Sequence, residues 1–174
     1  MVKDLLFPKE NEEVLLARTK ILGYTHIILC YPGLEKNRDI SYPGIKVTFA
    51  VTGTSKIAVS RLIEAKHDLR TQLEQSKQLL VVAPNFSHQD PFHSRATGFN
   101  QVLCKIMEKH KHTLVIFISD LLADQGKYLG RVQQHFRLAK KFKFEILLAT
   151  GASSEYGLKS AYDLSSLYRL LQKS

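Results

Sequence analysis

Four short and almost continuous apolar runs constrain the fold of this 174-residue chain more than any other feature of its sequence. They begin near His26, Leu79, Thr113 and Glu145. Each run is too short for a typical helix and is typical of a strand that is covered on both faces. Because segments with helical periodicity mostly alternate with these runs, the sequence predicts an α/β fold with a parallel sheet, either closed or open.

The first half is predicted to open with a β-α-β unit, which should be parallel and right-handed. Its strands lie at 3–7 and 26–30, and Asn11 would cap the helix between them, which Gly23 would end. The side of this helix that we expect to be buried consists of Val14, Leu15, Ile21 and Leu22.

The rest of the first half is predicted to add strands to the sheet. A loop at 32–44 precedes two expected strands at 46–51 and 57–63. A helix from about 67 to 76 then leads to a strand at 78–83.

The second half is predicted to contain three helices and two strands. The strands lie at 113–118, where Ser119-Asp120 ends the run, and at 145–149, which leads into the small-residue turn 150–154. The first helix would follow Thr97 as its cap, with an apolar stripe at Phe99, Val102, Leu103, Ile106 and Met107.

The last helix begins with Ser160 and Asp163, whose spacing resembles a capping box. Its apolar stripe consists of Leu164, Leu167, Tyr168 and Leu171.

The middle helix, from about 127 to 143, is predicted to have one apolar and one basic side. Its apolar side consists of Leu129, Val132, Phe136 and Ala139. Its opposite side carries Lys127, Arg131, Gln134, Arg137 and Lys141. By helix rise these five positions form a stripe about 20 Å long.

Such a stripe can follow a phosphate backbone, although a run of charges is most often only a solvated outer face. The segment 125–144 contains no acidic residue, which favours contact with RNA. We expect Lys140, Lys143 and Lys159 to add to this surface.

Several pieces of the second half resemble a known family in their order and spacing. They are Gly98-Phe99-Asn100-Gln101-Val102-Leu103, Ser119-Asp120-Leu121-Leu122, Gly130-Arg131, Arg137-Leu138-Ala139-Lys140-Lys141, Thr150-Gly151-Ala152-Ser153 and Lys159-Ser160-Ala161-Tyr162-Asp163-Leu164. This ordered set resembles the thirty-kilodalton protein subunit of archaeal and eukaryotic ribonuclease P, called component three in archaea. The set carries the resemblance, because no single piece is specific.

The resemblance implies a TIM-type barrel of the kind shared with a metal-dependent phosphoesterase superfamily. It implies that the chain supports the ribonuclease P RNA in endonucleolytic removal of the 5′ leader from precursor tRNA. The hydrolysis and its magnesium ions would belong to the RNA, with no cofactor bound by this chain. A small RRM-like protein subunit of ribonuclease P is the implied protein partner.

The chain departs from this family in one stretch. Between Ala83 and Gly98 the family would have a further strand-helix-strand passage, whereas the chain has only the short polar segment 84–97. The sequence therefore predicts a reduced or incomplete barrel.

Composition sets the remaining limits. With 44% hydrophobic residues and no visible linker or repeat, one domain spanning residues 1–174 is expected. The N-terminus lacks the apolar run of a signal peptide, so we expect a cytoplasmic protein, or a nuclear one if the source is eukaryotic. Cys30 and Cys104 lie inside apolar patterns and are expected to be buried free thiols.

The net charge of +9 indicates a polyanionic partner such as nucleic acid, or an acidic protein or membrane surface. The charge is unevenly distributed. Residues 95–174 carry 13 Lys and Arg against 6 Asp and Glu, a net charge of +7, and residues 1–94 carry 12 against 10, a net charge of +2. The basic excess therefore lies in the half that carries the resemblance.

Sites in α/β folds form where loops leave the carboxyl ends of strands. The loops at 83–85, 119–120 and 150–153 are therefore predicted to share one rim. Capping of the following helices explains these residue types as well as an RNA or partner contact does.

A metal-dependent phosphoesterase is the alternative function, and it needs several converging His and carboxylate ligands. The first strand, where the related phosphoesterases carry a His-x-His pair, reads Lys3-Asp4-Leu5-Leu6-Phe7. The pair His110 and His112 follows a helix and is interpreted as surface histidines, and the sequence has no nucleophile elbow or nucleotide-binding glycine motif. We therefore expect no catalytic and no metal-binding residue. A barrel-derived scaffold that binds only protein is a third possibility.

Overall fold

The computed structural model describes residues 2–33, 39–53, 59–65, 68–84, 98–123 and 127–173. The strands are β1 (Lys3–Leu6), β2 (His26–Tyr31), β3 (Lys46–Val51), β4 (Ser60–Glu64), β5 (Leu80–Val82), β6 (Thr113–Phe117) and β7 (Glu145–Ala149). The helices are α1 (Glu12–Ile21), α2 (Leu69–Gln75), α3 (Gln101–Lys109), α4 (Ile118–Ala123), α5 (Lys127–Phe142), the 3-10 turn η1 (Glu155–Gly157) and α6 (Ala161–Lys173).

The strands follow one another in sequence order in one sheet, from β1 to β7. The pairs β1-β2, β2-β3, β3-β4 and β5-β6 are parallel. Parallel strands in sequence order with interspersed helices define the α/β TIM-barrel class of fold. The sequence pattern predicted the parallel α/β sheet, and the family resemblance implied the barrel. A complete barrel of this class has eight strands, and the described residues supply seven, in agreement with a reduced barrel.

Contacts within the chain divide it into two compact units. The first unit comprises Met1–Leu62 and Leu148–Tyr168, and the second comprises Ile63–Leu147 and Arg169–Ser174. Each unit is described by itself below. That residues 1–174 form a single domain stays a prediction.

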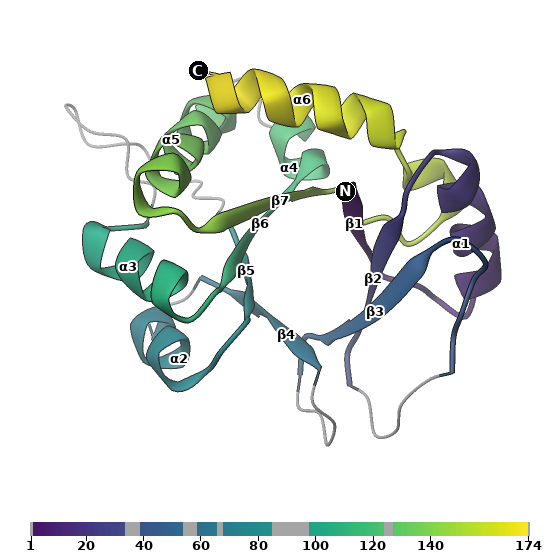
Figure 1. The fold of residues 1–174 in the computed structure, drawn as a ribbon, viewed down its shortest axis with the longest axis horizontal. Helices are drawn as coiled ribbons and strands as arrows, with labels where there is room; N and C mark the ends of the chain where they lie inside the picture. The colour runs from purple at the N-terminus through teal and green to yellow at the C-terminus, as the bar shows by residue number, and fades with distance from the viewer. Residues whose placement is uncertain are drawn as a thin grey trace. The chain divides into compact units, whose positions relative to one another are not determined.

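In the first unit β2 is the central strand, and all six of its residues are buried. His26 of β2 pairs with Lys3 of β1 and Lys46 of β3, and α1 lies beside these strands (Figure 1). Gly53 lies just after β3, next to the loop that follows β2. A Cβ atom at this position would lie 2.5 Å from the carbonyl oxygen of Pro32. Only glycine fits that approach.

The predictions for α1 were partly wrong. The Asn11 side chain does not cap the helix; its Oδ1 accepts from the Lys9 amide at 2.9 Å and its Nδ2 donates to the Ser153 carbonyl at 3.0 Å. Val14 and Ile21, predicted to be buried, are 50% and 75% exposed. Apolar residues occur all round this helix, so their periodicity does not single out one face.

In the second unit β5 and β6 pair from Leu80 opposite Thr113, and α2, α3 and α5 lie on one side of them (Figure 1). Helix α3 begins where the Asn100 side chain accepts from the Leu103 amide at 2.9 Å. The expected cap Thr97 lies outside the described residues. Val102 is 49% exposed, so its place in the predicted buried stripe was wrong.

Helix α4 was not predicted. The strand expected to reach 118 ends at Phe117, because the chain continues directly into α4. The cap of α6 was predicted correctly. The Asp163 amide donates to the Ser160 Oγ at 3.0 Å, so Ser160 caps this helix.

Candidate functional site

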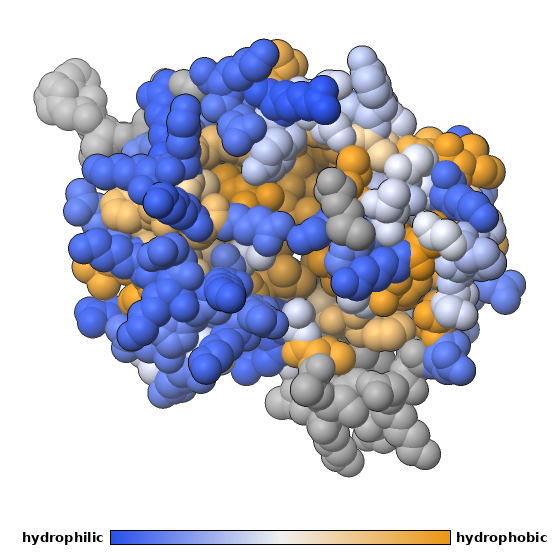
Figure 2. Space-filling model, in the orientation of Figure 1, coloured by the Kyte–Doolittle hydropathy of each residue, from blue (hydrophilic) through white to orange (hydrophobic). Residues whose placement is uncertain are grey.

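The outer face of α5 carries three exposed basic side chains, Arg137, Lys140 and Lys141, and Lys143 is exposed just beyond the helix. Gln134, which belonged to the predicted stripe, is half-buried. No acidic residue lies between 125 and 144 to compensate these charges within the segment. Figure 2 shows a mainly hydrophilic surface over the part of the second unit where α2 and α3 lie.

The placement of Arg131 on this exposed face was wrong, because the Arg131 side chain is only 5% exposed. Arg131 follows Tyr128 by three residues and precedes His135 by four, so the three side chains lie on one side of α5. Tyr128 and His135 are fully buried. Leu129, predicted to be buried, is instead 38% exposed.

The side of α5 that is buried therefore consists of polar as well as apolar groups. Its members are Tyr128, Arg131, Val132, His135, Phe136 and Ala139. Because these six side chains fix the rotation of α5 about its axis, they determine which basic residues face solvent. Lys127 opens α5, but its side chain lies outside the described part of the chain.

Burial changes the ionisation of this inner side. Burial, with the positive charge of Arg131 as a smaller cause, lowers the pKa of His135 to about 4. Its ring meets the Phe99 ring edge-on, with centroids 5.5 Å apart. Burial also raises the pKa of Tyr128 above its ordinary value, and the negative charge of Asp120 adds to this shift. At neutral pH, His135 and Tyr128 are therefore uncharged.

In the first unit the loop after β7 lies against the carboxyl end of β1. The Gly151 amide donates to the Leu5 carbonyl at 3.1 Å, and the Phe7 amide donates to the Ala152 carbonyl at 3.0 Å. Gly151 has a φ of +64°, a backbone conformation that favours glycine. Ser119 and Asp120 lie inside α4, and Asn85 lies outside the described residues, so a rim shared by all three loops stays a prediction.

Asp4 anchors this loop and was not identified from the sequence. Its carboxylate is fully buried and accepts from the Thr150 amide and the Thr150 hydroxyl, both at 2.7 Å, and from the Leu5 amide at 2.8 Å. Burial outweighs these hydrogen bonds and raises the pKa of Asp4 to about 6. The only signal in the sequence was a carboxylate directly before an apolar pair.

Lys159, the remaining residue predicted to contact RNA, is also in the first unit. Its side chain is exposed, and its carbonyl accepts from the Tyr24 hydroxyl at 2.8 Å. The backbone that carries this lysine is thus held in place.

The interpretation of His110 and His112 as surface histidines was wrong for His112. Its side chain is 1% exposed, its Nδ1 accepts from the Leu79 amide at 3.0 Å, and its Nε2 lies 3.0 Å from the Leu73 carbonyl. His110 is half-buried and its ring stacks on that of His112 at 5.7 Å. His67, His88 and His93 lie outside the described residues.

Cys30 and Cys104 are buried free thiols, as predicted, and burial raises their pKa values to about 12 and about 11. Within the described ranges no three His, Cys, Asp or Glu side chains are grouped so that they could hold a metal ion. Among the same residues no helix is long and apolar enough to cross a membrane.

The fold and this surface together define a TIM-barrel-type α/β protein with an exposed basic helix face. Comparison with known proteins gives the particular relationship. Ribonuclease P protein component 3 of Methanothermobacter thermautotrophicus is 29% identical over 102 residues, which is 56% of this chain and 39% of that protein. The protein of the same name from Methanocaldococcus jannaschii is 29% identical over 79 residues, 43% of this chain and 34% of that protein.

These matches support the resemblance drawn from the sequence: over these segments the chain is similar to ribonuclease P protein component 3 of two archaea. The matched segments span less than two-fifths of each relative. No family model matches the chain. A chain in a cryo-EM structure of archaeal ribonuclease P with mature tRNA has the same fold, with a TM-score of 0.66, 19% identity, and coverage of 97% of this chain and 82% of that one.

Proposed function

We propose that this chain is a protein subunit of ribonuclease P that supports the catalytic RNA in endonucleolytic removal of the 5′ leader from precursor tRNA. The observation that carries the proposal is its relationship to ribonuclease P protein component 3 in two archaea. The shared fold with a chain of an archaeal ribonuclease P–tRNA structure supports it.

In this role the exposed face of α5 contacts RNA phosphates through Arg137, Lys140 and Lys141, and Lys159 provides a contact from the first unit. Exposed cations that neutralise phosphates release counterions, so the affinity for RNA falls steeply with salt. For Arg131 we propose a role other than the predicted RNA contact. Its buried side chain helps to set the orientation of α5 rather than reaching a phosphate.

The remaining parts of the proposal come from the family. The partner RNA and its magnesium ions carry out the hydrolysis, and the chain contributes no catalytic group. A small RRM-like subunit is the protein partner, and the complex is located in the cytoplasm, or in the nucleus of a eukaryote.

Reconstitution tests the proposal. Precursor tRNA is incubated with the cognate RNA and the other protein subunits, with and without this chain, and with this chain alone. We expect the chain to stimulate cleavage at the 5′ leader only in the mixture. Absence of stimulation at every magnesium concentration tested would refute the proposal.

The metal-dependent phosphoesterase is not favoured, because both curated relatives carry the ribonuclease P name. The same experiment separates the two functions. Metal-dependent cleavage by the chain alone would support the phosphoesterase, whereas a scaffold that binds only protein would show no salt-sensitive RNA binding.

A further inference from the structure

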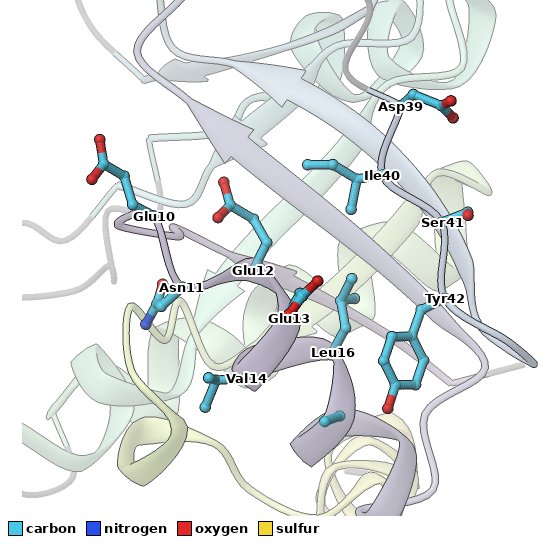
Figure 3. A pocket seen from close by; sticks show the side chains of 11 residues that line it. Glu10, Asn11, Glu12, Glu13, Val14, Leu16, Asp39, Ile40, Ser41 and Tyr42 are labelled. Atoms are coloured by element: carbon cyan, nitrogen blue, oxygen red, sulfur yellow. The ribbon is translucent and has the colours of Figure 1, made fainter.

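A groove of about 1060 Å³ lies beside α1 in the first unit. One wall is formed by residues 10–14, 16 and 17, at and just before the start of α1, and the other by residues 39–42 (Figure 3). The residues that line the groove come from a different part of the sequence than α5, and none of them is proposed above to contact RNA.

The groove combines carboxylates with apolar side chains. Glu10, Glu13 and Asp39 are exposed on its walls, and the Glu12 carboxylate is held by the Tyr31 hydroxyl at 2.9 Å. Figure 3 shows the acids of α1 and Ile40 directed into the space between the two walls.

The apolar part of the lining is accessible as well. Val14 is 50% exposed, while Ile40 and Tyr42 are half-buried. The Lys20 ammonium lies 5.7 Å from the centre of the Tyr42 ring and helps to hold that ring in place. An occupant could therefore bury apolar surface here as well as pair with charge.

The negative charge of the groove indicates which class of occupant it would bind. Most of the basic excess of the chain lies in the second unit, which carries 15 Lys and Arg against 8 Asp and Glu, a net charge of +7. The first unit, which contains the groove, carries 10 against 8, a net charge of +2. Four carboxylates around one groove repel phosphates and attract cations. An RNA backbone is thus disfavoured at the groove, and a positively charged protein segment is favoured.

We propose that this groove docks a segment of a protein partner that carries both basic and apolar side chains. This inference rests on the proposed function, because the partner is a protein of the same ribonucleoprotein. The basic residues of the segment pair with the acidic rim, and its apolar residues cover Val14, Ile40 and Tyr42. Apolar contact surrounded by charge is the usual anatomy of a protein interface.

The test compares a groove variant with a control variant on the same helix. Glu13→Gln combined with Val14→Gln alters the groove, and Ile21→Gln alters an exposed apolar residue of α1 that does not line it. All three residues are exposed, so these variants should fold, which circular dichroism and the thermal midpoint will check. Tagged chains are mixed with the purified cognate protein subunits of ribonuclease P without RNA, and separately with the ribonuclease P RNA.

We expect the groove variant to lose about tenfold or more in affinity for a protein subunit, as the loss of an interface centre does. Ile21→Gln should change that affinity by about twofold at most. Both variants should bind the RNA as the wild-type chain does.

Five results would overturn the inference. Unchanged protein binding by the groove variant excludes the groove, and an equal loss with Ile21→Gln assigns the contact to the outer side of α1 instead. Loss of RNA binding by the groove variant makes RNA the occupant, and wild-type self-association that the groove variant lacks makes a second copy the occupant. If the wild-type chain binds no protein subunit, the inference fails, and the cleavage assay still decides the proposed function independently.

Discussion

Reversal of two charges on α5, Arg137→Glu with Lys141→Glu, gives the most direct test of how this chain meets RNA. The two side chains are one helical turn apart, about 6 Å along the axis by helix rise, and both are exposed. Neither belongs to the buried side that holds α5 against the second unit. The change should therefore remove phosphate contacts without unfolding the protein.

The expected size of the effect follows from counterion release. Each phosphate contact contributes about 0.7 to 0.9 to the slope of log affinity against log salt. Loss of two contacts should lower the slope by about 1.4 to 1.8. The contribution of two contacts also changes by about tenfold between 50 mM and 200 mM salt, so the variant and the wild type should converge as salt rises.

The assay is filter binding or fluorescence anisotropy with the ribonuclease P RNA over this salt range. Lys105→Glu with Lys109→Glu is the matched control, because it has the same spacing and the same change in net charge on exposed positions of α3 in the same unit. An unchanged slope for the α5 variant, or an equal change for the α3 variant, would refute the assignment of the contact to α5. Net charge alone would then explain the binding.

Three further predictions concern stability and are measured by urea unfolding. The pKa of Asp4 is raised from 3.8 to about 6, so the free energy of unfolding should fall by about 3 kcal/mol as pH rises from about 4 to 6. The pKa of His135 is lowered from 6.5 to about 4, so the free energy of unfolding should rise by a similar amount as pH rises from about 4 to 6.5. Asp4→Asn should therefore become more stable with rising pH and His135→Phe less stable, while the wild type changes less than either; parallel curves for all three would contradict this. His112→Ala should lower the free energy of unfolding by about 3 kcal/mol, because the Leu79 amide and the Leu73 carbonyl lose their hydrogen bonds to the buried imidazole. An effect below about 1 kcal/mol would show that water replaces the ring. Gly53→Ala should lower the free energy of unfolding by about 2 kcal/mol, since its Cβ would lie against the Pro32 carbonyl. Gly44→Ala separates this clash from the cost of the backbone conformation, because Gly44 has a positive φ and a Cβ there would meet only the Lys20 Cε, at an ordinary contact distance of 3.9 Å.

The order of the elements was predictable because it depends on local patterns. The runs at 46–51 and 145–149 became β3 and β7 with the expected bounds, and the basic helix ends within one residue of its predicted end. Ser160 capped α6 through the hydrogen bond that its spacing predicts. These features need only the side chains and the backbone nearby.

What the sequence did not reveal depends on partners far along the chain. Asp4 and Thr150 are 146 residues apart, and His112 meets the backbone of Leu73 and Leu79, 39 and 33 residues away. A carboxylate or an imidazole that finds such a partner can be buried. Residue type alone therefore placed His112 on the surface, and it gave no sign that Asp4 holds the loop after β7.

Arg131 shows how this limit affects the reading of a functional surface. Charge patterning sorts a helix into a polar and an apolar side, and it assigned Arg131 to the polar side with Arg137 and Lys141. Tyr128 and His135 flank Arg131 at helical spacing, and both are fully buried without being strongly apolar by type. Because the buried side of α5 is partly polar, its centre lies closer to Arg131 than the aliphatic residues alone indicate. The exposed basic face is therefore rotated toward Lys140, and this rotated face is the one that we propose for RNA contact.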